Sequence, residues 1–378
     1  MNRYVVTTVR ALMLTALVAG FGIANASAQV EIESKAAKIK ITGRVQAMYD
    51  YSSAAEELSS IFLIRRARLT MQMTINDWIE GKVQPDFSTG FGLENGIRLK
   101  DAYIDFVFSD PFRIRVGQFK RPFDRFELTS STQILVIERT GFVRGADSCA
   151  GVGSVCSYSR LTEKLGFADR DVGLMIGGKI GDNWVWSASA TNGQIFEDIV
   201  TFTGPVDTTE VFSDGKSFGG RLEYRAKNLV IGANAAAHDY ANAVLLDQVE
   251  YGYGYGADFD WGSYKGPGFH VKAGVTAGDN WKNLDTAGKP SNFWTTQGIL
   301  AYRWGIANND RLEGVEIVGR VSYADPDTGV SDDEGLLFTP GVVTYFTGRN
   351  KFAINADIYQ PGGGDWEYSV RAMAYLYF

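Results

Sequence analysis

The chain has 378 residues, with 37 Lys and Arg against 44 Asp and Glu, so its formal charge is −7. An acidic chain is a poor nucleic-acid binder, because contacts to phosphates need clustered cations, and we expect no nucleic-acid partner. Hydrophobic residues make up 45% and charged residues 21%, which excludes an intrinsically disordered chain. The two histidines, His238 and His270, leave little room for a metal site, and no cofactor is implied.

Residues 1–28 have the pattern of a cleaved secretory signal peptide. Arg3 and Arg10 precede an apolar run from 11 to about 24, and an Ala-Ser-Ala cleavage pattern ends at residue 28. The alternative is an N-terminal membrane anchor, but this apolar run is too short to cross a bilayer easily. Cleavage leaves 35 basic and 44 acidic residues, so the mature chain 29–378 carries −9. It has no other long apolar run, so we expect one exported domain that is either soluble or a β-barrel.

Strict alternation of apolar and polar residues is the main structural signal. Between 38 and 51, Ile39 and Ile41 fall on one face while Lys40 and Thr42 fall on the other. This period of two predicts a strand with one apolar and one polar face. Sixteen such segments follow one another, near 38–51, 61–75, 78–88, 97–109, 112–119, 171–180, 183–191, 216–226, 228–238, 251–262, 268–277, 293–304, 312–323, 336–347, 351–360 and 367–378.

Short and long connections alternate along most of the chain. An up-and-down barrel places alternate connections at opposite rims, and outer-membrane barrels keep periplasmic turns short and outside loops long. Long loops are expected at 52–60, 89–96, 120–170, 192–215, 239–250, 278–292, 324–335 and 361–366. We therefore predict an all-β fold, a 16-stranded antiparallel transmembrane β-barrel, with both termini on the periplasmic side.

The two faces of the predicted strands suit the two environments of such a barrel. The polar face is densely charged, which fits a water-filled lumen, and the apolar face fits lipid. Aromatic residues near strand ends predict girdles at the membrane interfaces, with ordinary strand positions as the alternative. The residues concerned are Trp78, Trp184, Trp261, Trp294 and Trp304.

Cys149 and Cys156 are the only cysteines, and six residues separate them. In an exported chain this spacing predicts a disulfide that closes a small loop, with two free thiols as the alternative. A metal site is disfavoured, because no histidine or further cysteine lies nearby.

Several segments together resemble the phosphate-selective porin O/P family of bacterial outer membranes. They are 64–69 (Ile-Arg-Arg-Ala-Arg-Leu), 99–104 (Leu-Lys-Asp-Ala-Tyr-Ile), 116–123 (Val-Gly-Gln-Phe-Lys-Arg-Pro-Phe), 127–131, 137–140, 170–173 and the terminal Phe378. The specific matches cover about residues 60–180. The resemblance implies a barrel that is usually a homotrimer, sits in outer-membrane lipid and passes small anions or other small hydrophilic solutes. It also implies that the third long loop, here 120–170, folds into the lumen and narrows it, where a disulfide would stiffen the constriction.

Eight cations are the candidate pore-lining and anion-binding residues. They are Arg44, Arg66, Arg68, Lys82, Arg113, Arg115, Lys120 and Arg121. An anion that enters a narrow pore loses hydration, and fixed cations replace the lost water; guanidinium groups also match phosphate oxygens. The alternative is that these cations pair with Glu80 and the lumen acids Asp86, Asp101 and Asp105, which would leave a weakly selective pore.

The mature charge of −9 departs from the arginine ladders and lysine clusters of the phosphate-specific members. The sequence thus favours an anion-preferring porin over a highly phosphate-specific one. Two alternatives remain: a general porin of weak selectivity, and an enzyme anchored by its barrel. An enzyme needs an activated nucleophile with a base in reach, but His238 and His270 lie at strand ends without a serine-rich companion motif. A soluble protein that binds a partner would be found outside the membrane fraction.

Overall fold

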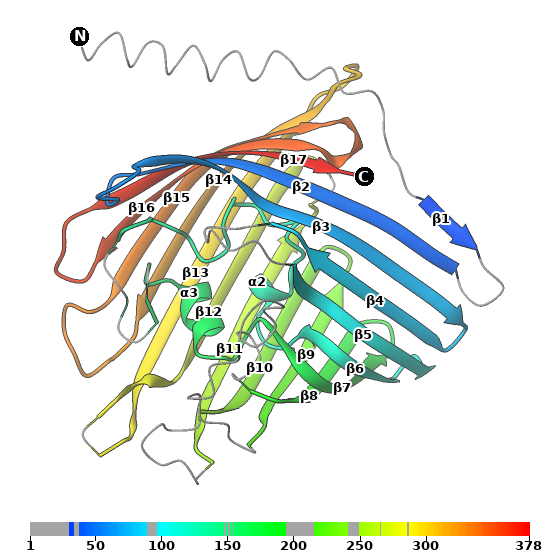
Figure 1. Cartoon of the computed structure of the whole chain (residues 1–378), viewed down its shortest axis with the longest axis horizontal. Coiled ribbons are helices and arrows are strands. Elements are labelled where there is room, and N and C mark those ends of the chain that lie inside the picture. The colour runs from blue at the N-terminus through cyan, green and yellow to red at the C-terminus, as the bar shows by residue number, and fades with distance from the viewer. Residues whose placement is uncertain are drawn as a thin grey trace.

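One antiparallel sheet closes on itself to form a barrel (Figure 1). The computed structural model describes residues 30–33, 38–88, 97–146, 149, 152–153, 155–193, 215–240, 249–264, 266–285 and 287–378. The expected signal peptide at 1–28 lies outside the described residues. Among the residues described, no helix is long and apolar enough to span a membrane.

Sixteen strands make up the barrel wall, which confirms the predicted fold class. They are β2 (Lys38–Ser52), β3 (Ser60–Asn76), β4 (Ile79–Asp86), β5 (Arg98–Ser109), β6 (Phe112–Lys120), β7 (Arg170–Ile180), β8 (Trp184–Thr191), β9 (Ser217–Ala226), β10 (Leu229–Asp239), β11 (Tyr251–Gly262), β12 (Gly268–Leu284), β13 (Pro290–Gly305), β14 (Leu312–Asp325), β15 (Gly335–Phe346), β16 (Lys351–Pro361) and β17 (Glu367–Tyr377). Each strand pairs with the next, and β17 pairs with β2 from Ser369–Ser52 to Tyr377–Arg44, which closes the wall.

Two features differ from the sequence prediction. The loop expected at 278–292 is mostly strand, because β12 and β13 continue to pair as far as Leu284 and Pro290. Asn280 is fully buried there and donates a hydrogen bond of 2.9 Å to the carbonyl of Pro326, which holds this extension. A short additional strand, β1 (Val30–Glu33), pairs with the start of β2, beyond the point where β17 ends.

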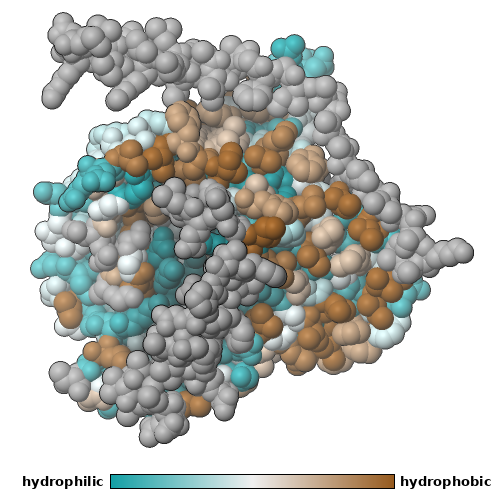
Figure 2. Space-filling view, in the orientation of Figure 1, coloured by the Kyte–Doolittle hydropathy of each residue, from teal (hydrophilic) through white to brown (hydrophobic). Residues whose placement is uncertain are grey.

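The polar faces of the strands point inward and their apolar faces point outward. Along β2, the side chains of Arg44, Gln46 and Asp50 are buried, whereas Val45 and Tyr49 between them are partly exposed. Large apolar residues are exposed on the outer surface of many strands, and Figure 2 shows brown residues covering the visible flank of the wall. This is the reverse of a water-soluble protein and matches a wall surrounded by lipid.

The five tryptophans expected at the interfaces all project outward. Their exposed fractions lie between 39% and 47%, and each stands near the end of a strand. Trp78, Trp184, Trp261 and Trp304 adjoin short connections, whereas Trp294 lies near the opposite rim. Their positions suit the level of lipid headgroups on the two sides of a bilayer.

The chain between β6 and β7, residues 121–169, is here named the inner segment. It contains two short helices, α2 (Arg125–Leu128) and α3 (Tyr158–Lys164), whose N-caps are Asp124 and Ser157. Figure 1 draws both helices within the outline of the barrel. The inner segment packs against inward-facing residues of the wall, and together they form the apolar core, which includes Phe123, Val143, Leu161, Leu165, Phe167, Phe293, Leu337 and Tyr359.

Candidate functional site: a cationic passage beside the inner segment

Three cavities follow one another along β2–β9, on the side of the lumen that the inner segment leaves open. The rim chamber, about 280 Å³, lies toward the long connections and is lined by Ser88, Arg98 and Lys100 among others. The middle chamber, about 360 Å³, shares Lys120, Ser131 and Arg170 with it. The turn chamber, about 290 Å³, shares Lys82 and Tyr103 with the middle chamber and ends near the short turns. These shared residues place the three chambers next to one another, and together we call them the passage.

Seven of the eight candidate cations line this passage. Arg66 and Arg68 line the rim chamber, and Lys120 stands where it meets the middle chamber. The middle chamber also contains Arg44, Lys82, Arg113 and Arg115. The three candidate acids are divided among the chambers: Asp86 lies in the rim chamber, Asp101 in the middle chamber and Asp105 in the turn chamber.

Arg121 is the exception and lies away from all three chambers. Its side chain is buried and donates a hydrogen bond of 2.9 Å to the carbonyl of Ala168, and it lies 3.4 Å from Nδ1 of His238. The physical reason is that β6 ends at Lys120, so the alternation that puts strand residues into the lumen no longer applies at the next position. Arg121 therefore fastens the start of the inner segment to its end.

Most of these cations are held by carboxylates. Arg68 donates to Asp86 at 2.5 Å, and Lys82 donates to Asp101 at 2.5 Å. Arg115 binds both oxygens of Asp105 at 2.7 Å, with its guanidinium 3.8 Å from the centre of the Tyr103 ring. These three cations therefore pair with the lumen acids, as in the alternative interpretation of the sequence. Arg66 and Lys120 instead pair with acids of the inner segment, Glu138 and Glu127.

A second group of cations lines the passage without a carboxylate within 4 Å among the residues the structure describes. Its members are Arg44, Arg98, Lys100, Arg113 and Arg160, and we call them the unpaired cations. Arg44 donates to the amide oxygen of Gln84 at 3.3 Å. The unpaired cations extend from the rim chamber to the middle chamber, and nearby carboxylates act on some of them only at longer range, as Asp169 does on Lys100.

Several charged residues of the passage were not selected from the sequence. From the inner segment these are Arg125, Glu127, Glu138, Arg139, Arg160, Glu163 and Asp169, and from the strands Lys38, Lys40, Arg65, Arg98, Lys100, Arg170, Arg221, Glu223 and Arg225. The residues of β2 and β9 share the inward parity of their strands, so that signal was present for them. Arg65, Arg98, Lys100 and Arg170 lie on the other parity, where the strand pairing is irregular or where a strand begins, and alternation did not indicate them. The inner-segment residues have no periodicity to reveal them, and the only indication was that 127–131 and 137–140 belong to the family-like motifs.

Two carboxyl groups of the inner segment have shifted pKa values. Burial alone would raise the pKa of Glu138, but Arg65 and Arg66 more than offset it and lower the pKa to about 2. Burial, reinforced by Asp169 and Glu127, raises the pKa of Glu163 to about 7. Glu163 lines the rim chamber, so the charge of that chamber changes near neutral pH.

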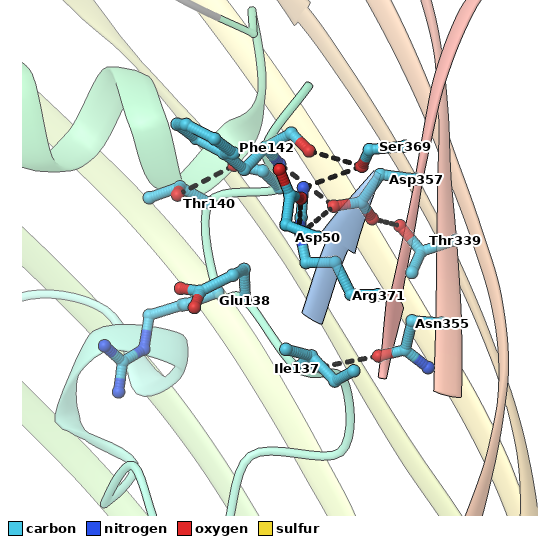
Figure 3. Close-up of polar contacts among 12 residues, drawn as sticks. Asp50, Ile137, Glu138, Thr140, Phe142, Thr339, Asn355, Asp357, Ser369 and Arg371 are labelled. Atoms are coloured by element: carbon cyan, nitrogen blue, oxygen red, sulfur yellow. Dashed lines mark hydrogen bonds and ion pairs between the residues drawn. The ribbon is translucent and has the colours of Figure 1, made fainter. Parts of the chain in front are cut away.

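A buried network of polar groups fixes the inner segment to β14–β17 (Figure 3). In the figure, Arg371 lies between Asp50 and Asp357, and extended backbone of the inner segment passes beside them. The backbone N–H of Phe142 donates to Asp357 at 2.9 Å, and that of Ile137 donates to Asn355 at 2.6 Å. Further contacts come from Ser369, which donates to the carbonyl of Phe142, and from Arg320, which donates to the carbonyls of Glu138 and Arg139. The wall therefore satisfies this backbone much as a neighbouring strand would.

A disulfide joins Cys149 and Cys156 in the C-terminal half of the inner segment, and both residues are buried. A glycine of the wall makes room for it. A Cβ at Gly335 would lie 2.4 Å from Cβ of Cys156, so no larger residue fits there without a shift. Likewise, a Cβ at Gly254 would lie 2.9 Å from the ring of Phe167. These positions allow the segment to lie close against the wall.

The two histidines occupy structural positions. His238 is fully buried, with Nδ1 2.7 Å from the hydroxyl oxygen of Ser217 and its ring stacked on Trp281. His270 is paired through Nε2 with Asp260 at 2.8 Å. Within the described parts of the chain, no group of three or more His, Cys, Asp or Glu side chains is arranged to hold a metal ion.

Comparison with known proteins gives a family and a fold. The model of the family described as phosphate-selective porin O and P matches residues 39–265. An uncharacterized protein of Aquifex aeolicus is 28% identical over 130 residues, which are 29% of this chain and 31% of that protein. The chain therefore aligns with about a third of the length of that relative.

Solved structures of outer-membrane channels resemble the whole barrel. The anion-selective porin from Comamonas acidovorans has a TM-score of 0.60 at 12% identity, covering 90% of this chain and 100% of that one. The outer membrane channel DcaP of Acinetobacter baumannii has a TM-score of 0.59 at 12% identity, covering 92% and 99%. OmpT of Vibrio cholerae, in its trimer form, has a TM-score of 0.57 at 10% identity, covering 91% and 100%. At these identities the likeness establishes the barrel fold.

Proposed function

Because the chain belongs to the phosphate-selective porin O and P family, we propose that it forms an outer-membrane channel in which small anions pass more readily than cations. The observation that carries the preference is the charge of the middle chamber. Nine cations line it against two carboxylates, Asp101 and Glu223. Seven of these nine cations pair with a carboxylate, in part with Asp105, Glu127, Asp258 and Asp260, which are not among the lining residues of this chamber. Among the described residues Arg44 and Arg113 have no such partner, so the proposed preference depends mainly on these two.

The chemistry of permeation follows from this lining. An anion entering the passage exchanges part of its hydration shell for N–H groups of Arg and Lys, while a cation finds few free acceptors because most carboxylates already accept from Arg or Lys. One structural neighbour is an anion-selective porin, which agrees with this preference. Phosphate is one candidate solute, because guanidinium groups match its oxygens.

The inner segment is proposed to set the width of the channel. It occupies the side of the lumen along β11–β17 and leaves the passage along β2–β9. We also propose a homotrimer as the working assembly, since one structural neighbour, OmpT of Vibrio cholerae, was solved in a trimer form. Crosslinking of the detergent-folded protein followed by native gel electrophoresis checks the assembly, and a monomer at all concentrations would contradict it.

The test of ion preference is the reversal potential of the folded protein in a planar lipid bilayer under a KCl gradient. Discrete current steps with a potential on the chloride side support the proposal, and added phosphate then tests competition. Steps with a neutral or potassium-side potential would leave a general porin of weak selectivity. Folded protein without current steps would remove the channel itself and bring a barrel-anchored enzyme forward, for which a hydrolase assay is the next measurement.

A further inference from the structure

The middle chamber has more apolar side chains among its cations than either neighbour, since the turn chamber has Met73 and the rim chamber has Phe142. Met175 of β7 and Val185 of β8 occupy inward positions, and Leu128 of α2 lines the same cavity. All three side chains are only partly buried, so they contact the solution in the chamber. In the rim chamber, Phe142 is the one apolar residue of the described lining, and the remainder is charged or hydroxylated.

Strand register puts these apolar groups beside guanidinium groups. Met175 lies directly opposite Arg115, and the next inward position of β6, Arg113, lies opposite Gly177. Gly177 in turn faces Ser187, so two small residues form the floor next to Arg113. Arg113 belongs to the unpaired cations, so its guanidinium is available to an incoming anion.

We propose that the middle chamber selects organic anions that carry an apolar body, such as monocarboxylates with an alkyl tail, over small inorganic anions. The carboxylate would bind Arg113, and the tail would lie on Met175, Val185 and Leu128. Chloride and inorganic phosphate have no group that benefits from these side chains. This substrate class rests on the proposed anion-preferring channel and adds a preference that charge alone does not give.

The physical basis is the hydrophobic effect in a partly open cavity. Complete burial of one methylene group improves binding roughly threefold to fourfold. Contact on one side in this chamber realises part of that gain, so about 1.8-fold per methylene is expected. Hexanoate has four more methylenes than acetate at the same charge, so the two anions separate the tail from the head group.

The experiment measures block of the chloride current through the bilayer-reconstituted protein by acetate, butyrate and hexanoate at pH 7.4. The concentration for half-block should fall about tenfold from acetate to hexanoate. Met175→Gln with Val185→Thr should flatten this dependence, and Met175→Leu should retain it. For each variant, the half-block concentration of acetate is divided by that of hexanoate for the same protein, so differences in conductance between variants cancel. Arg113→Gln should weaken block by all three acids by a similar factor.

Two failures are distinguishable. A chloride-side reversal potential with equal half-block for acetate and hexanoate would overturn the selection of apolar tails and leave the anion channel standing. A neutral or potassium-side potential would overturn the anion channel itself. A chain-length dependence that persists unchanged in the double variant M175Q with V185T would place the apolar contact elsewhere and overturn the assignment to this chamber.

Discussion

The buried guanidinium of Arg371 in β17 donates a hydrogen bond of 2.6 Å to Oδ2 of Asp357 in the neighbouring strand β16. Both side chains are at most 2% exposed. Oδ2 of Asp357 also accepts from the backbone of the inner segment at Phe142, and Oδ1 accepts from Arg320. The pair thus serves to hold the segment that borders the passage rather than to contact a solute.

Replacing Arg371 by Met should loosen the inner segment from the wall. The change leaves Asp357 and Asp50 buried without their shared cation, which costs roughly 3 kcal/mol in the free energy of unfolding. The single-channel current should become less steady, because the segment is then held less firmly beside the passage. Thermal unfolding and bilayer recording check both effects. Arg371→Lys, which retains the charge, is the control; wild-type values for Arg371→Met would show that the ion pair does not position the segment.

The unpaired cations should govern ion preference more than the paired ones. Lys100→Gln or Arg160→Gln should each lower the chloride-to-potassium permeability ratio about sevenfold, because removing a unit charge at about 7 Å in a water-like medium changes the free energies of chloride and potassium by roughly 0.6 kcal/mol each, in opposite directions. Reversal potentials under a KCl gradient measure the ratio. Lys289→Gln, in an outer connection, is a matched loss of charge outside the passage. Equal effects at all three positions would contradict a local field.

The sequence indicates Arg66 and Arg68 as anion-binding residues, and replacing both tests that prediction. Neutralising both should also shift the potential toward potassium, but it leaves Asp86 without its 2.5 Å partner, so part of the shift comes from the released acid. The Arg68→Gln, Asp86→Asn double variant separates the two contributions. If the ion preference of the Arg66→Gln, Arg68→Gln protein stays at the wild-type value, these residues do not form the filter.

Anion preference should increase as the pH falls from 8 to 6. Burial, with Asp169 and Glu127 nearby, raises the pKa of Glu163 to about 7, so its negative charge is lost in this window. Because the folded-state pKa is raised, the associated stabilisation is complete below the ordinary value near 4.5 and is lost as the pH rises through about 7. Reversal potentials at both pH values check the direction, and Glu163→Gln should reduce the change. A preference that falls on acidification would refute the assignment.

Gly335→Ala should weaken the contact between the wall and the disulfide of the inner segment. The new Cβ would lie 2.4 Å from Cβ of Cys156, and overpacking of this kind costs about 1–3 kcal/mol in stability. Gly319→Ala is the matched control, because a Cβ there has no heavy atom within 4 Å. Thermal unfolding distinguishes them: equal melting temperatures would mean that the segment adjusts without strain.

The disulfide should stabilise the protein by restricting the unfolded chain. Replacing Cys149 and Cys156 by Ser opens a loop of sequence separation 7, for which chain entropy predicts a loss of about 2.5 kcal/mol. The double Ser variant, unfolded beside the wild type with and without a reductant, measures this. A reductant that lowers the wild-type melting temperature and leaves the variant unchanged is the expected result; sensitivity of both would point to an effect unrelated to this bond.

The barrel was predictable because alternation is a property of each strand by itself. The sixteen expected segments correspond to β2–β17, mostly within a residue or two at each end. The extension of β12 and β13 beyond Gly278 was not predictable from the sequence, because it depends on a contact between Asn280 and Pro326, which lie far apart in the chain. The short β1 depends in the same way on the edge of β2 that β17 leaves open.

The passage was less predictable than the wall. Seven of the candidate cations line the cavities, but parity carries no information on pairing, so Arg113 and Arg115 looked alike although only Arg115 binds a carboxylate among the described residues. Glu163 and Arg160 belong to α3, whose placement depends on packing inside the barrel. That such residues line the passage can be seen only in the folded structure, in which the inner segment packs against the wall.

Because the inner segment covers only one side of the lumen, the inward face of this barrel is really two different surfaces. Met373 and Val343 point inward but are shielded from water by Ile137 of the inner segment. A charged residue at either position would therefore destabilise the protein, as it would in the core of a water-soluble protein. Lys82 and Arg113, also inward, face the solution in the passage, so their replacement changes charge and ion pairing and not the packing of a core. If every inward position were substituted in turn, the tolerated residues should differ between the two halves of the barrel. Side-chain volume should limit them beneath the inner segment, and charge should limit them along the passage.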